Sequence, residues 1–175
     1  PALRPPLEAQ LIDLADEIAY STADLDDAQQ AGFFTLDELG KAVPAWDDLY
    51  DTAQSMYPGA SPRVQFHEAL RQLIDLLVSG FVEGTVRACR DAGVRTVDDV
   101  RAHPQRLACL LPDARKTCLE LKRFLRQKVY LSKTLNAERE RSVQMIAELF
   151  QYFEADPARL PDPYREQVAA RPAHN

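Results

Sequence analysis

Residues 13–27 read Asp-Leu-Ala-Asp-Glu-Ile-Ala-Tyr-Ser-Thr-Ala-Asp-Leu-Asp-Asp, and their spacing predicts a helix with two opposed faces. One face, called the acidic stripe below, carries carboxylates and a tyrosine: Asp13, Asp16, Tyr20, Asp24 and Asp27. The opposite face carries Leu11, Leu14, Ala15, Ile18, Thr22 and Leu25. Carboxylates on one face repel one another unless a cation or a hydroxyl-rich ligand lies there. The stripe is therefore a solvated acidic surface or a ligand site, and spacing alone leaves both open.

Helical periodicity extends through the chain without strand-like alternation, which predicts an all-α fold. The main helices are expected at 7–31, 62–92, 113–131 and 134–155. Thr35 and Thr96 have the spacing of helix N-caps, Pro44 and Pro58-Gly59 interrupt the helical pattern, and a loop is expected over 103–113. The apolar residues that repeat at helical spacing over 62–92 are Phe66, Leu70, Leu73, Ile74, Leu77, Val78, Phe81 and Val82. The expected core of the later helices is Phe124, Leu125, Val129, Met145, Ile146, Leu149, Phe150 and Phe153. These patterns divide the chain into segments 1–32, 33–155 and a proline-rich surface tail, 156–175.

Composition excludes several functional classes. The net charge of −6 over 175 residues argues against a general nucleic-acid or anionic-membrane binder. Three cysteines without metal-type spacing favour a reduced, cytoplasmic compartment, and no apolar run approaches the ~18 residues that a membrane helix needs. Because the chain starts at Pro1 without a methionine, and the polar stripe begins almost at once, we expect a fragment of a longer protein.

Familiar catalytic motifs are missing from the sequence. It contains no glycine-rich phosphate loop, no G-x-S-x-G and no HExxH. The stretch from Asp24 resembles the start of a calcium loop, but Gln29 stands where glycine is needed and Thr35 where the bidentate glutamate should be. The three histidines are too widely separated for a zinc motif, and His67 is expected to be a capped or surface residue.

Two blocks of sequence resemble a known family. The first is Leu7-Glu-Ala-Gln-Leu-Ile-Asp-Leu-Ala-Asp-Glu-Ile-Ala-Tyr20 with Asp24-Leu-Asp-Asp27 and Ala31-Gly32. The second is Leu121-Lys-Arg-Phe-Leu125 with Val129-Tyr130, Leu149-Phe150, Asp156-Pro157, Leu160-Pro161 and Tyr164-Arg165. In order and spacing they resemble the C-terminal portion of the HD-superfamily dNTP triphosphohydrolases, the bacterial dGTPase and dGTPase-like proteins. The resemblance implies an HD-domain-type helical assembly, with segment 1–32 as the last helix of its metal and nucleotide site.

The resemblance also implies a reaction and roles for three residues. Members use a divalent metal, Mg²⁺ or Mn²⁺, to activate a water that attacks the α-phosphorus of a dNTP, with dGTP the expected substrate, and release deoxynucleoside and tripolyphosphate. Asp16 matches the last metal ligand. Tyr20 and Asp24 match positions that meet the deoxyribose, the ring packing on the sugar and the carboxylate accepting from the 3′-hydroxyl. A homo-oligomer is also implied.

This sequence departs from the family pattern at two places, and the upstream metal ligands of the family are absent from it. Ala23 replaces a histidine found in many relatives, and Leu131-Ser132-Lys133 replaces Arg-His-Pro, which leaves substrate choice and phosphate contacts open. Arg63, Arg71 and Lys133 are candidates for the triphosphate. No histidine precedes Asp16 and no His-Asp pair occurs, so the chain alone is expected to be inactive. The alternative is a non-catalytic helical oligomerisation or nucleotide-sensing module.

Overall fold

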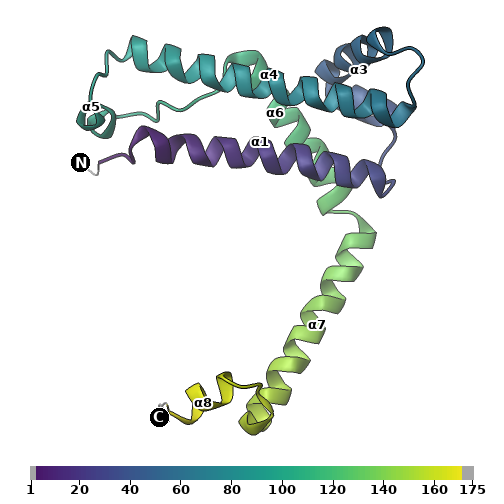
Figure 1. Ribbon diagram of the computed structural model, residues 1–175, viewed down its shortest axis with the longest axis vertical. Helices are drawn as coiled ribbons and strands as arrows, with labels where there is room; N and C mark the ends of the chain where they lie inside the picture. The colour runs from purple at the N-terminus through teal and green to yellow at the C-terminus, as the bar shows by residue number, and fades with distance from the viewer. Residues whose placement is uncertain (1–2, 171–175) are drawn as a thin grey trace. The chain divides into compact units, whose positions relative to one another are not determined.

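The computed structural model describes residues 3–170, and that range contains eight α-helices and no strand, which confirms the predicted all-α class (Figure 1). The helices are α1 Leu7–Gln30, α2 Leu36–Ala42, α3 Pro44–Met56, α4 Pro62–Asp91, α5 Val97–Ala102, α6 Pro112–Leu125, α7 Lys133–Ala155 and α8 Tyr164–Ala169. A π-helical turn, Arg126–Tyr130, follows α6, and a 3₁₀ turn, Pro157–Arg159, follows α7. The chain forms two compact units that divide after Tyr130.

Local sequence signals set most helix ends in the first unit. α1 stops before Gly32, whose φ of 72° is a backbone conformation that glycine adopts without strain. Thr35 and Thr96 are both N-caps, as predicted, and each forms a capping box in which Glu38 or Asp99 accepts a hydrogen bond from the cap backbone. Because Pro44 lacks a backbone N–H, it opens α3 as its first residue, which separates α3 from α2.

The core of the first unit lies around α4. This helix packs against α3, α1 and α6, and α1 also contacts α6. Trp46 from α3, Leu25 from α1, Leu73 and Leu77 from α4 and Leu121 from α6 are at most 1% exposed. Their burial holds the four helices together through the hydrophobic effect. The predicted core on α6 is confirmed, and so is that on α4 except at Ile74, Val78 and Val82, which are exposed.

Two glycines let α4 approach the segment that leads into α6. A Cβ added at Gly80 would lie 2.4 Å from Ala114 Cβ, and one at Gly84 would lie 2.5 Å from the carbonyl oxygen of Cys109. The backbone N–H of Leu111 donates to the carbonyl of Gly80 at 2.9 Å. The start of α6 is therefore fixed against α4 by a contact that only glycine permits.

The second unit contains α7, the 3₁₀ turn and α8. The predicted core on α7 is wrong, because this helix buries no residue, and Ile146 and Phe150 are 66% and 67% exposed. Within the unit the 3₁₀ turn contacts α7, and α8 contacts the turn. The predicted tail contains α8, a short helix the sequence analysis did not anticipate; residues 171–175 of that tail lie outside the described range.

No helix within the described range combines the length and apolar character needed to cross a membrane.

Candidate functional site

The acidic stripe forms one face of α1, as the spacing predicted. Because α1 is a continuous helix from Leu7 to Gln30, Asp16, Tyr20 and Asp24 lie one above the other at intervals of one turn. Asp16 is exposed and Tyr20 is 69% exposed, whereas Asp24 is half-buried. Within this row of three, Asp16 is therefore open to solvent and Asp24 is partly covered.

Asp24 is partly covered by a residue of the π-helical turn that follows α6. The hydroxyl of Tyr130 donates a hydrogen bond to Oδ2 of Asp24. Burial, followed by this hydrogen bond and the negative charge of Asp24, raises the pKa of Tyr130 to about 12, so the phenol stays protonated and remains a donor at neutral pH. Sequence reasoning did not pair these residues, since they are far apart in the chain and no local pattern links them.

Ion pairs tie the side of α1 next to the stripe to the body of the unit. Glu17 accepts from Lys122 of α6 at 2.9 Å, and Asp13 lies 3.2 Å from Arg106. Gln10, 3% exposed, accepts through its side-chain oxygen from the backbone N–H of Leu107 at 2.9 Å. These contacts fix the rotation of α1 about its axis, and with it the direction of the acidic stripe. Asp13 is therefore an ion-paired member of the stripe.

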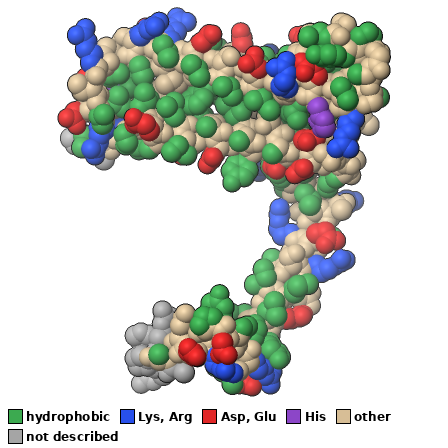
Figure 2. Space-filling model, in the orientation of Figure 1, with side chains coloured by type: hydrophobic (Ala, Val, Ile, Leu, Met, Phe, Trp, Pro, Cys, Tyr) green, Lys and Arg blue, Asp and Glu red, His purple; other side chains and the backbone are tan. Residues whose placement is uncertain are grey.

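An apolar groove lies on the other side of the stripe, between α1 and α4. It has a volume of about 550 Å³ and is lined by Ala15, Ile18, Ala19, Thr22, Ala23, Asp26, Leu70, Ile74, Val78, Phe81 and Val82. Figure 2 shows hydrophobic side chains gathered along the adjoining parts of the two helices. Ile74, Val78 and Val82 are 38%, 43% and 54% exposed, so the groove is open. Ala19 and Ala23 border the stripe, because each lies close to Asp16 around the helix axis.

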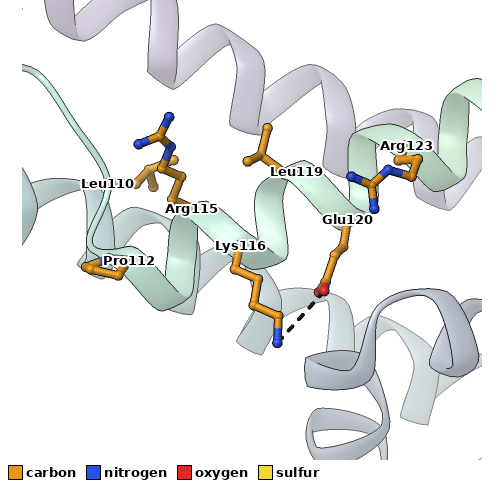
Figure 3. Close-up of a pocket in the computed structure, with 7 residues that line it drawn as sticks. All are labelled: Leu110, Pro112, Arg115, Lys116, Leu119, Glu120 and Arg123. Carbon is orange, nitrogen blue, oxygen red and sulfur yellow. Dashed lines mark ion pairs between the residues drawn. The ribbon is translucent and has the colours of Figure 1, made fainter.

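None of the basic residues predicted for a triphosphate forms an ion pair with the acidic stripe within the described range. Arg71 is held by Glu68 at 2.6 Å, and Arg63 is exposed on the first turn of α4. Lys133 begins α7, in the second unit. A pocket on α6, missed by the sequence analysis, carries Arg115, Lys116 and Arg123 with Leu110, Pro112, Leu119 and Glu120 (Figure 3). Lys116 turns toward Glu120, 4.0 Å away, and no residue of the stripe lines this pocket.

The described residues do not form a metal site by themselves. Between residues 3 and 170, no group of three or more histidine, cysteine, aspartate or glutamate side chains is arranged to hold an ion. His67, expected to be a capped or surface residue, pairs its Nε2 with Oδ1 of Asp26 at 3.1 Å and so joins α4 to α1. Asp16 is free to act as one oxygen ligand, but a single carboxylate does not complete a coordination shell.

Known proteins match most of the chain. Residues 108–175 match the family described as the phosphohydrolase-associated domain. A protein of Azoarcus sp. (strain BH72), called deoxyguanosinetriphosphate triphosphohydrolase-like protein, is 37% identical over 94% of this chain and 43% of its own length. Proteins of the same name from Ralstonia nicotianae and Geobacter sulfurreducens are 36% and 29% identical, over 95% and 96% of this chain and 43% of theirs. The chain therefore spans less than half the length of these relatives.

Proposed function

Because this chain is a homologue of part of the deoxyguanosinetriphosphate triphosphohydrolase-like proteins, we propose that it supplies one wall of the active site of a metal-dependent dNTP triphosphohydrolase. The whole enzyme converts a dNTP, with dGTP the expected substrate, and water into deoxynucleoside and tripolyphosphate. The observation that carries this proposal is the row of Asp16, Tyr20 and Asp24 along α1, with Asp24 anchored and Asp16 open.

Each residue of the row has a role suited to its surroundings. Asp16, exposed and without a hydrogen bond or ion pair in the described part of the chain, is available as one oxygen ligand to a divalent cation. Tyr20 offers a 69% exposed ring on which a deoxyribose can pack. Asp24 is a carboxylate with one oxygen held by Tyr130, which leaves Oδ1 to accept from a sugar hydroxyl.

The remaining metal ligands must come from a part of the protein outside this chain, and the apolar groove is the surface on which we place that part. Ala19 and Ala23 line the groove and lie close to Asp16 around the helix axis, so a segment seated in the groove would lie beside Asp16. The relatives are more than twice as long as this chain, so they contain a large part that the chain does not match. The occupant we assign is a helical segment from that part of the longer protein, with an apolar face toward Val78 and metal-binding side chains toward Asp16.

Val78→Ser tests the occupied groove in the full-length protein. If a segment covers Val78, the change removes buried apolar area and leaves a hydroxyl in the interface, so the free energy of unfolding falls by about 2 kcal/mol. Val64→Ser is the matched control, because Val64 is an exposed valine of the same helix outside the groove, 51% exposed. Chemical denaturation measures both. Equal, small effects of the two changes would mean that the groove is open, and an effect that depends on protein concentration would mean a second copy.

The activity itself is tested on the full-length protein. It is incubated with each of the four dNTPs and Mn²⁺ or Mg²⁺, and deoxynucleoside and tripolyphosphate are separated by ion-exchange chromatography. We expect both products in equal amounts and no products after removal of the metal with EDTA. Light scattering on the same preparation reports whether the protein is a homo-oligomer.

If none of the four dNTPs is hydrolysed, even with mixed dNTPs added as activators, the proposal is contradicted. The alternative, a non-catalytic oligomerisation or nucleotide-sensing module, would then account for the helical architecture and leave the stripe as a solvated surface. Release of pyrophosphate in place of tripolyphosphate would contradict the reaction while retaining a nucleotide site.

A further inference from the structure

The end of α6 departs from regular α-helix immediately before it reaches the acidic stripe. From Arg126 to Tyr130 the chain winds as a π-helical turn. Such turns widen the helix by one residue and re-aim the side chains that follow, and they are frequent at functional sites. Val129 of the turn is buried, 7% exposed, as is Leu125 just before it, whereas Lys128 and Tyr130 form the polar side of the turn.

Two polar contacts fasten this turn to the N-terminal helices. Lys128 donates from Nζ to Oε1 of Glu38 at 2.5 Å, and this hydrogen bond is the main reason why the pKa of Glu38 is lowered. Glu38 is also the glutamate of the capping box that opens α2. The second contact is the hydrogen bond from Tyr130 to Asp24 on α1. Because Val129 between them is buried, the turn has little freedom to rotate, and the Tyr130 hydroxyl has a fixed position.

The position of that hydroxyl matters for Asp24. An ionised carboxylate accepts through both oxygens, and Tyr130 occupies only Oδ2. An aspartate held at one oxygen cannot swing about its side-chain torsions without breaking that bond, whereas an exposed aspartate on a helix samples several rotamers. A carboxylate that is already oriented loses less conformational entropy when it accepts from a ligand.

We propose that Tyr130 is a positioning residue for the sugar subsite: its hydroxyl holds Asp24 so that the second carboxylate oxygen is presented to the 3′-hydroxyl of the deoxyribose. The inference rests on the proposed function of Asp24. It assigns a role in substrate recognition to a residue of the phosphohydrolase-associated domain, residues 108–175, whose sequence position lies far from α1.

Tyr130→Phe in the full-length protein tests this role, with dGTP and 2′,3′-dideoxy-GTP as paired substrates. The variant keeps the ring and loses only the hydroxyl. We expect kcat/KM for dGTP to fall about 10-fold, mainly through KM, because a hydrogen bond to a charged group that orients the binding carboxylate is lost. Because dideoxy-GTP has no 3′-hydroxyl for Asp24 to accept from, kcat/KM for that substrate stays unchanged, and the preference for dGTP falls about 10-fold.

Two further variants separate positioning from general structure. Tyr57→Phe, at a tyrosine 44% exposed and outside the stripe, should leave both substrates unaffected. In an Asp24→Asn background, Tyr130→Phe should produce no additional loss of dGTP preference, since the oriented carboxylate is already gone. Equal losses with both substrates would mean that Tyr130 has only a structural role. An unchanged preference in an active enzyme overturns the inference alone, whereas a wild-type protein inactive on every dNTP overturns the proposed function with it.

Discussion

Asp16→Ala in the full-length protein is expected to lower dNTP hydrolysis about 10³-fold, the equivalent of several kcal/mol of transition-state stabilisation that depends on a correctly held metal. The same change should leave the free energy of unfolding within about 0.5 kcal/mol, because Asp16 is exposed and alanine suits a helix at least as well as aspartate. The measurements are tripolyphosphate release, Mn²⁺ binding by electron paramagnetic resonance, and urea denaturation.

Asp27→Ala is the matched control for this prediction. Asp27 belongs to the same acidic stripe, is exposed, and has no role assigned by the resemblance. If the stripe acts only through its summed negative charge, both alanine variants weaken Mn²⁺ binding by a similar factor. If Asp16 is a ligand, only its variant does so. Retention of full activity by Asp16→Ala would show that the metal-ligand role is wrong.

Helix boundaries in the first unit were predictable because they depend on local chemistry. A threonine followed three residues later by an acidic side chain satisfies backbone donors at a helix start, as at Thr35 and Thr96. Gly32 adopts a positive φ without strain, and Pro44 lacks an N–H, so each acts without help from distant residues. The resemblance to dGTPase-like proteins is also confirmed, and it follows from short blocks whose order and spacing are readable in one sequence.

The core on α7 was not predictable from the same kind of signal. Periodicity at Met145, Ile146, Leu149 and Phe150 indicates an apolar face, but it does not say whether anything covers that face. In the structure these side chains are at least 50% exposed. On α4 the equivalent pattern was correct where α3 and α6 supply partners, and Ile74, Val78 and Val82 of the same pattern stay exposed where they line the groove.

The candidate site, like the core, was predictable from the sequence only in part. Spacing places Asp16, Tyr20 and Asp24 on one stripe, because a helix repeats every 3.6 residues. The contact between Tyr130 and Asp24 depends on how α6 crosses α1 and on the π-helical turn, neither of which has a signature in the sequence. The roles of these residues stay predictions.

Gly84→Ala is expected to destabilise the full-length protein by about 3 kcal/mol, although glycine inside a helix usually costs about 1 kcal/mol relative to alanine. Helix propensity alone would thus make the change stabilising. The contact with the next segment reverses the sign, because a Cβ at this position would lie 2.5 Å from Cys109 O and 2.8 Å from both Leu110 C and Leu111 N. All three are backbone atoms and cannot rotate away.

Relief of this clash requires α4 and the 109–111 segment to separate, and several contacts oppose that movement. Leu111 donates to Gly80, and the Thr85 hydroxyl both donates to Cys109 O and accepts from Cys109 N at 3.3 and 3.2 Å. Gly59→Ala is the control, since a Cβ there meets nothing within 4 Å, and its effect should stay within about 0.5 kcal/mol. Urea denaturation measures the free energy of unfolding of both variants. A Gly84→Ala protein as stable as wild type would mean that α4 and the segment before α6 do not approach each other closely.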